Sequence, residues 1–260
     1  MLGYYKRHGR KMPWRETSDP YCILISEIML QQTQVSRVVD KYNQFVAAFP
    51  NFTALSNAPL SRVIAVWQGL GYNRRAFALS KLARIVVDKY NGELPASITA
   101  LTTLPGIGFA TASSICAFAF DAPVAFIETN IRTVFIHHFF KKKKTVSDEE
   151  ILPLVKKCLP GSNPRKWYWA LMDYGVMLKK TGNDRNSRSA HYVKQTKFEG
   201  SRRQVRGNVL AALVEANVMT IVQLQRRVND TRLSEVVTQL IEEGFVLRGR
   251  GGLRFVQTPA

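Results

Sequence analysis

The sequence predicts a mainly helical protein, all-α up to about residue 180, followed by a smaller C-terminal module. Apolar residues recur at helical spacing in long stretches such as "APLSRVIAVWQGL" and "NRRAFALSKLARIVVDKY". Aliphatic residues almost vanish between Lys179 and Arg206, where nine lysines and arginines stand against two acids. Beyond that connector, three further helical stretches precede an alternating pattern, which indicates a separate module of about sixty residues.

Local signals place the ends of several helices. Asp19 and Pro20 are an N-cap followed by proline at the first helical position, and they predict a helix from Pro20 through Gln34 or beyond. Asn91-Gly92 closes the helix of "NRRAFALSKLARIVVDKY". Ser147 and Glu150 form a capping box that opens another helix. "NPRKWYWALMDYGVMLKK" predicts one more, so the sequence indicates helices throughout this part of the chain.

The C-terminal module is expected to contain three helices and a β-hairpin. The helices are predicted over "SRRQVRGNVLAALVEAN", "TIVQLQRRV" and "DTRLSEVVTQLIEEG", the last capped by Asp230 and ended by Gly244. "FVLRGRGGLRFVQTP" alternates on either side of residues 249–252, as hairpin strands do. This order of elements is typical of a winged helix, which contacts DNA in some proteins and protein partners in others.

Composition limits the partners. The chain has 260 residues, 46% of them hydrophobic, and 37 lysines and arginines against 19 acids give a net charge of +18. Such a surplus favours nucleic acid as a partner, and no signal peptide, lipidation motif or membrane-spanning segment is evident. Cys22, Cys116 and Cys158 are scattered and predict buried free thiols in a reducing compartment. We therefore expect a cytoplasmic monomer, nucleoid-associated in a prokaryote, with no membrane partner.

A short turn in "LTTLPGIGFATASSICAFAF" suggests how nucleic acid is held. Gly106 and Gly108 let the backbone bend tightly, and the next helix starts at once. Its free N–H groups and positive dipole end would suit a phosphate. The alternative is an ordinary corner between two helices.

Six stretches in order carry a family resemblance: "MPWR" (12–15), "SEIMLQQTQV" (26–35), "WQGLGYNRRA" (67–76), "LPGIGFATA" (104–112), "IETNIRTV" (127–134) and "ALMDYGVM" (170–177). Together they closely resemble the MutY-type adenine DNA glycosylases of the helix-hairpin-helix superfamily, over roughly residues 1–195. The resemblance implies two helical domains, one from 21–130 and one from 1–20 with 131–195, beside the winged-helix-like module at 196–260. It also implies that DNA and the extruded base bind in the cleft between the helical domains.

The resemblance assigns a role to Glu27, whose counterpart in the family protonates the departing adenine. Glu27 lies within "ILISEIML", and a carboxyl among aliphatic side chains tends toward the raised pKa that a general acid needs. Gln31, Gln32 and Gln34 can replace the hydrogen bonds of a lost base. The family inserts a glutamine matching Gln32 and a tyrosine matching Tyr72 into the duplex. The alternatives are a solvent-facing glutamate and a packed tyrosine.

The second carboxylate departs from the family pattern. An aspartate in a DGN-like triplet is usual there, whereas this chain has Glu128-Thr129-Asn130. Glu128 is expected to stabilise the cationic sugar, and Asn130 to orient it. The extra methylene and the β-branched Thr129 alter the geometry, and a misplacement near 1 Å can cost about a hundredfold in rate. The alternative is a bystander acid beside Arg132.

Three further departures concern the lysine nucleophile, the metal cluster and the C-terminal domain. Lyase-type relatives have a Schiff-base lysine, and MutY-type proteins a serine or tyrosine, where this chain has Ala110. The family's iron–sulfur cysteine spacing falls on Lys179, Asn186, Ser189 and Gln195, none of which is a thiolate ligand, so we expect no metal and no 4Fe-4S cluster. The family's C-terminal domain that recognises 8-oxoguanine is replaced by the winged-helix-like module.

These observations predict a monofunctional DNA glycosylase in base excision repair, acting on an adenine mispaired with 8-oxoguanine or guanine. Efficient AP lyase activity is not expected. A glycosylase for mismatched thymine or uracil, and a catalytically impaired DNA-binding protein on the same scaffold, are the alternatives. The predicted catalytic residues are Glu27, Glu128 and Asn130. The predicted contacts to double-stranded DNA are Arg15, Gln32, Gln34, Tyr72, Pro105, Gly106, Ile107, Gly108, Arg185 and Arg188.

Overall fold

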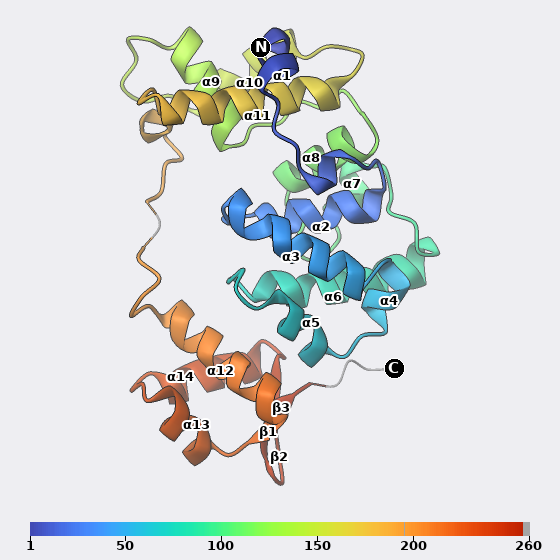
Figure 1. Ribbon diagram of the computed structural model, residues 1–260, viewed down its shortest axis with the longest axis vertical. Helices are drawn as coiled ribbons and strands as arrows, with labels where there is room; N and C mark the ends of the chain where they lie inside the picture. Colours follow the sequence, from blue (N-terminus) through green and yellow to red (C-terminus); the bar gives the residue numbers. More distant parts are fainter. Residues whose placement is uncertain (195, 257–260) are drawn as a thin grey trace. The chain divides into compact units, whose positions relative to one another are not determined.

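The computed structural model describes residues 1–194 and 196–256 (Figure 1). Its contacts divide the chain into two compact units. Unit 1 comprises residues 1–27, 96–103 and 107–194, and unit 2 comprises 28–95, 104–106 and 195–260. Helix α2 (Pro20–Leu30) and the turn before α8 therefore contribute residues to both units. The three-domain division predicted from the sequence stays a prediction.

Unit 1 is built around two adjacent helices, α9 and α11, and α1 also packs on α11 (Figure 1). Tyr168 of α11 is fully buried, and its hydroxyl donates to the Val124 carbonyl oxygen at 2.7 Å. The remaining helices complete the unit. Its elements are α1 (Leu2–His8), η1 (Pro13–Arg15), most of α2, α7 (Ile98–Leu101), α8 (Phe109–Ala119), α9 (Thr129–Phe139), α10 (Asp148–Cys158), α11 (Pro164–Lys180) and η2 (Asn186–Arg188).

Unit 2 joins a helical layer to the C-terminal module. Helix α6 packs on α4 and α5, and α12 packs on α5. The helices are α3 (Val35–Ala48), α4 (Phe52–Ser56), α5 (Leu60–Trp67), α6 (Arg74–Tyr90), α12 (Arg202–Ala216), α13 (Ile221–Val228) and α14 (Leu233–Glu242). The strands are β1 (Val218–Met219), β2 (Val246–Gly249) and β3 (Gly252–Phe255), arranged as an antiparallel sheet in the order β1–β3–β2.

The C-terminal module has the three helices and the hairpin that the sequence predicts, and one strand more. Val218 and Met219 pair with Arg254 and Leu253 of β3, which extends the hairpin to three strands. Gly252 permits this pairing, because a Cβ there would lie 2.5 Å from the Met219 carbonyl oxygen. Two residues are too short a run to show a period of two, so β1 had no sequence signal.

The module is attached to α6 by an aromatic pair and an ion-pair cluster, all within unit 2. The rings of Phe77 and Phe245 lie 4.4 Å apart, and the Arg206 guanidinium covers Phe245 at 4.6 Å. Glu243 accepts from Arg206 at 2.6 Å and from Arg74 Nε at 3.0 Å. These contacts make the module part of the same compact body as α5 and α6.

Two sequence predictions are corrected. Helix α2 ends at Leu30 instead of reaching Gln34, because Gln32 adopts a left-handed conformation with φ 53°. The Asp19 cap at its start is confirmed, since the Tyr21 amide donates to the Asp19 carboxylate at 2.9 Å. All three cysteines are free, but only Cys116 is buried; Cys22 is half-buried, and Cys158 at the end of α10 is exposed.

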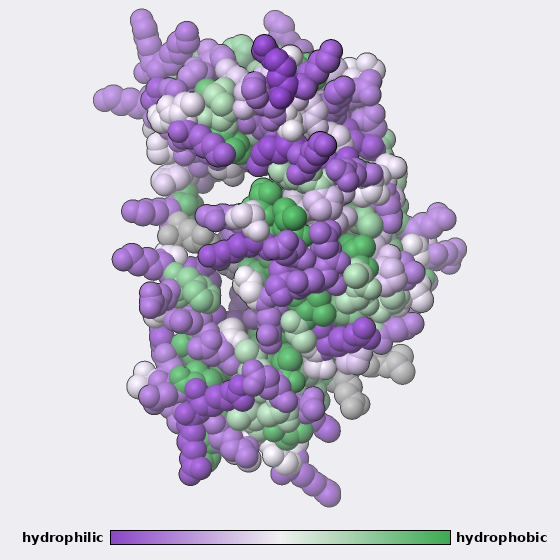
Figure 2. All heavy atoms as spheres, viewed as in Figure 1, coloured by the Kyte–Doolittle hydropathy of each residue, from purple (hydrophilic) through white to green (hydrophobic). Residues whose placement is uncertain are grey.

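Hydrophilic side chains predominate on the face shown in Figure 2. Residues 141–144, all lysines, are exposed. In the part of the chain that the structure describes, every helix is too short or too polar to span a lipid bilayer.

Candidate active site

Glu27 lies in the last two turns of α2, a helix that is otherwise almost entirely apolar. Its neighbours Ser26 and Ile28 are buried, whereas Glu27 itself is half-buried. The Ser114 hydroxyl of α8 donates to Glu27 Oε2 at 2.6 Å. Within unit 1, the carboxyl is therefore held by one hydroxyl group and keeps partial access to solvent.

The surroundings of Glu27 raise its pKa to about 7. Loss of hydration on burial is the largest cause, because it disfavours the charged form. The Ser114 hydrogen bond and the positive charge of Arg15 lower the pKa, and the negative charge of Glu128 raises it. A carboxyl with this pKa still holds its proton in a large share of molecules near neutral pH, as a general acid must.

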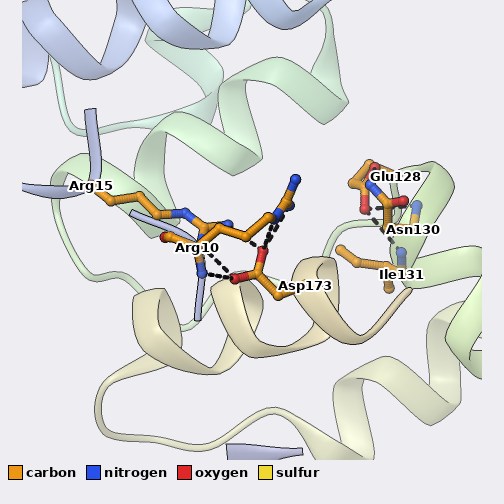
Figure 3. Close-up of polar contacts among 6 residues, drawn as sticks. All are labelled: Arg10, Arg15, Glu128, Asn130, Ile131 and Asp173. Atoms are coloured by element: carbon orange, nitrogen blue, oxygen red, sulfur yellow. Dashed lines mark hydrogen bonds and ion pairs between the residues drawn. The ribbon is translucent and has the colours of Figure 1, made fainter. Parts of the chain in front are cut away.

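Glu128 is the N-cap of α9, and three donors hold its carboxylate (Figure 3). Oε1 accepts from the backbone N–H groups of Asn130 at 2.8 Å and Ile131 at 2.9 Å. Oε2 accepts from the Asn130 side-chain amide at 3.2 Å. A carboxylate oxygen offers about two acceptor positions, so Oε2 retains capacity for a further contact. Asn130 therefore contacts Glu128 in the way an orienting residue would.

Figure 3 also shows an ion-pair cluster in which Arg10 and Arg15 surround the buried Asp173 carboxylate. The Arg15 guanidinium donates two hydrogen bonds to the Asp173 carboxylate of α11, at 2.9 and 3.0 Å. Arg10 donates to the same carboxylate from its backbone N–H at 2.8 Å and from its Nε at 2.7 Å. Burial alone would raise the pKa of Asp173, but the hydrogen bonds and charges of Arg15 and Arg10 outweigh it, and the pKa lies below its usual value. Asp173 is therefore the shared ion-pair partner of Arg10 and Arg15.

Arg15 is consequently tied into the interior of unit 1. Its side chain is 6% exposed and stacks on Trp169, with the guanidinium 5.5 Å from the ring centroid. The charge of Arg15 acts on Glu27 as well as on Asp173. A direct contact between Arg15 and DNA stays a prediction.

The glycine-rich turn has the backbone that the sequence anticipates. Gly106 has φ 79°, and a Cβ there would lie 3.0 Å from that of Ala78, so a side chain would be both strained and crowded. Gly108 is the N-cap of α8, and both glycines are exposed. Pro105 is half-buried, and Ile107 is buried, with 5% of the whole residue exposed.

In unit 2, Arg75 organises the segments that carry the predicted duplex-invading residues. Its guanidinium donates to the carbonyl oxygens of Ile28, Met29 and Gln31 at 2.6–2.9 Å. It also donates to those of Leu70 and Gly71, at 3.2 and 3.1 Å. Burial lowers the pKa of Arg75 to about 10. The Arg75 side chain thus holds in place both the turn after α2 and the turn after α5. No sequence motif indicated this role.

Gln32 and Tyr72, the residues predicted to enter the duplex, both have the left-handed backbone conformation of a turn. Gln32 is exposed at φ 53°, and Gln34 is exposed as the N-cap of α3. Tyr72 is half-buried at φ 48°. Arg203 of α12 donates to its hydroxyl and places a guanidinium 5.2 Å from its ring centroid. Tyr72 is therefore linked to the C-terminal module, a contact without a sequence signal because 131 residues separate the partners.

The loop that follows α11 holds the remaining predicted residues. Arg185 is exposed, and Arg188 donates to the Phe140 carbonyl oxygen. Backbone bonds of 2.9 Å join Val146 to Arg188 and Ala190. Lys179, Asn186 and Ser189, at three of the four cluster positions, do not fit an iron–sulfur cluster because none offers a thiolate, and Gln195 lies outside the described residues. The absence of a cluster stays a prediction.

The structure thus brings Glu27, Glu128, Asn130 and Arg15 into one electrostatic environment in unit 1. Gln32, Gln34 and Tyr72 belong to unit 2, each on or beside a turn. Sequence reasoning missed Ser114, Arg75 and Arg203. For Ser114 a signal existed, since it stands one helical turn after Ala110 on α8.

Comparison with known proteins places the chain in a family. The chain matches, over residues 25–160, the family described as "HhH-GPD superfamily base excision DNA repair protein". It is similar to an adenine DNA glycosylase of Buchnera aphidicola subsp. Baizongia pistaciae, with 37% identity over 68% of this chain and 51% of that protein. It is also similar to one of Mycolicibacterium smegmatis, with 29% identity over 96% of each.

A solved structure described as a thermostable thymine-DNA glycosylase aligns with a TM-score of 0.63 and 30% identity, over 68% of this chain and 82% of that one. The chain spans about half the length of several curated relatives that it matches. The family match covers more than half of the chain, including the α7–α8 hairpin and both candidate acids. The protein belongs to the HhH-GPD superfamily of base excision DNA repair proteins.

Proposed function

We propose that this protein is a monofunctional DNA glycosylase that hydrolyses the N-glycosidic bond of an adenine mispaired with 8-oxoguanine or guanine. The observation that carries the proposal is Glu27, an acid with a pKa raised to about 7, which shares its surroundings with the oriented carboxylate of Glu128. The adenine DNA glycosylases among its relatives support adenine as the base.

The chemistry divides between the two acids. Glu27 gives its proton to a ring nitrogen of the base as the C1′–N bond breaks, and the bonding electron pair leaves with the base. The negative charge of Glu128 stabilises the sugar while it is oxocarbenium-like. Water then adds to C1′ and passes a proton to the ionised Glu27, which restores the acid. Ala110, with no amine, offers no Schiff-base nucleophile, so strand cleavage does not accompany base release.

Double-stranded DNA is the partner this assignment requires. The net charge of +18 supplies attraction that is independent of base sequence. The start of α8 at Gly108 is suited to a phosphate, and Gln32 and Tyr72 are suited to fill the duplex after the base has left.

A thymine or uracil glycosylase is the second candidate, favoured by the alignment with a thymine-DNA glycosylase structure. Duplexes holding one A·8-oxoG, A·G, G·T or G·U pair, treated with hot alkali after incubation, distinguish the candidates. Breaks after alkali in the adenine strand support the proposal. Breaks confined to the G·T or G·U duplexes would move the assignment to thymine or uracil. Tight binding with no breaks would indicate a DNA-binding protein that has lost catalysis.

A further inference from the structure

Two consecutive serines on α8 differ in one contact. Ser113 and Ser114 are both buried, and each hydroxyl lies near a carbonyl oxygen of the preceding turn. Ser113 donates to Phe109 at 2.8 Å, and Ser114 lies 3.0 Å from the Thr111 oxygen. Ser114 also approaches Glu27 Oε2, at 2.6 Å. A hydroxyl has one proton, so Ser114 has two acceptors for a single donor.

The balance between those acceptors depends on the charge of Glu27. When Glu27 carries its proton on Oε1, both Oε2 and the Thr111 oxygen are neutral acceptors. When Glu27 is ionised, Oε2 is charged, and hydrogen bonds to charged acceptors are shorter and roughly twice as strong. The bond from Ser114 to Glu27 therefore strengthens as the acid loses its proton.

We propose that Ser114 is a positioning residue that directs proton transfer from Glu27. Its hydroxyl donates to Oε2, which leaves the acid proton on Oε1, turned away from Ser114 and available to the departing base. As the Oε1–H bond breaks, an N–H bond forms on the base and the C1′–N electron pair goes with it. The Ser114 proton stays on Oγ throughout. This inference rests on the proposed function, because it assumes that Glu27 is the acid.

The charges of Glu128 and Arg15 also act on Glu27, but Ser114 is the residue that donates a hydrogen bond to its carboxyl. Glu128 opposes ionisation of Glu27, and Arg15 favours it from a position fixed by Asp173. Ala110, four residues before Ser114, has no polar side-chain atom to contribute. In this chain α8 instead supplies a hydroxyl one turn later.

The test compares Ser114→Ala with the matched control Ser113→Ala and with Ser114→Thr, which keeps the hydroxyl. Each alanine variant loses one buried hydroxyl from the same helix, so a merely structural role would affect both alike. Two quantities are measured on the full chain: the pKa of Glu27, from NMR titration of 13C-labelled glutamate with Glu27→Gln to assign the signal, and the single-turnover rate of base release against pH.

The expected result is specific to Ser114→Ala. The pKa of Glu27 rises by about one unit, the alkaline limb of the rate profile moves up by the same amount, and the low-pH rate falls about tenfold, as for loss of a charge-assisted hydrogen bond. Ser113→Ala and Ser114→Thr stay close to the unaltered protein, and duplex affinity is unchanged in all three.

Two outcomes overturn the inference in distinguishable ways. If Ser114→Ala matches Ser113→Ala in both titration and rate while Glu27→Gln is inactive, Glu27 is the acid and Ser114 has no positioning role. If Glu27→Gln releases base as fast as the unaltered protein, the proposed function of Glu27 fails and the inference fails with it.

Discussion

Asn130 on α9 lies directly against Gly175 on α11. A Cβ placed on Gly175 would stand 2.6 Å from the Asn130 carbonyl oxygen and 2.8 Å from the Asn130 Cβ. This contact lets α9 and α11 approach closely at the point where Asn130 holds Glu128. The glycine of "ALMDYGVM" is therefore linked to the candidate active site by packing.

Gly175→Ala is expected to force α9 and α11 apart. Overpacking of this kind destabilises a protein by about 1–3 kcal/mol, and displacement of Glu128 is expected to slow base release by about a hundredfold. Urea denaturation and single-turnover kinetics measure the two effects. Gly207→Ala is the control, because Gly207 lies inside α12 with open space at its Cβ position and alanine there favours the helix. Equal behaviour of the two variants would contradict the packing argument.

Asp173→Asn is expected to destabilise unit 1 by about 3–5 kcal/mol, because it leaves the buried charge of Arg15 without its partner. The pKa of Asp173 is depressed in the folded protein, so its contribution is present above the ordinary pKa of an aspartate and is lost as pH falls through the folded value. Thermal melting from pH 7 to pH 3 tests this. A variant whose melting temperature equals that of the unaltered protein at pH 7 would refute it.

Glu27→Gln is expected to stabilise the protein at high pH. The folded pKa of about 7 lies above the ordinary 4.5, so the proton bound by Glu27 stabilises the folded state, fully below pH 4.5 and progressively less as pH rises through 7. The difference of about 2.5 units corresponds to about 3 kcal/mol at pH 8. Unfolding free energies of variant and unaltered protein should therefore diverge between pH 5 and 8. Parallel curves would show that the pKa is not raised.

The sequence predicted the features that neighbouring residues determine, and it missed those that depend on residues far apart in the chain. Caps and helical periodicity are local, and they placed the start of α2, the capping box of α10 and the end of α6 at Asn91. The predicted end of α2 was wrong because a residue of another helix determines it. Arg75 of α6 donates to the Gln31 carbonyl oxygen, beside the left-handed Gln32. Hydrophobic periodicity within a helix does not predict such a tertiary contact.

The candidate site shows the same limit. The two acids and Asn130 could be named from motifs, since each lies in a short quotable stretch. Helical spacing from Ala110 marks the position of Ser114 on α8, but it does not predict the hydrogen bond to Glu27, which spans 87 residues. The apolar neighbours of Glu27 predict that its pKa is raised, whereas the opposing effects of Ser114 and Arg15 come from residues distant in the sequence.

Glu243→Gln is expected to loosen the C-terminal module from α6. It removes the charge that pairs Arg206 and Arg74, and Arg206 is left partly buried without its anion. We expect a loss of about 1–3 kcal/mol and faster proteolysis in the connector between Lys179 and Arg206. Glu235→Gln is the control, because its ion pair with Arg202 is exposed and contributes little. Identical cleavage rates would show that the cluster around Glu243 does not hold the module.

The central claim is that Glu27 protonates a mispaired adenine, and single-turnover base release from an A·8-oxoG duplex at pH 6 tests it most directly. The account predicts alkali-dependent breaks at the adenine in the unaltered protein, and a loss of at least about a hundredfold in Glu27→Gln with duplex binding retained. Base release at an undiminished rate by Glu27→Gln would contradict the account.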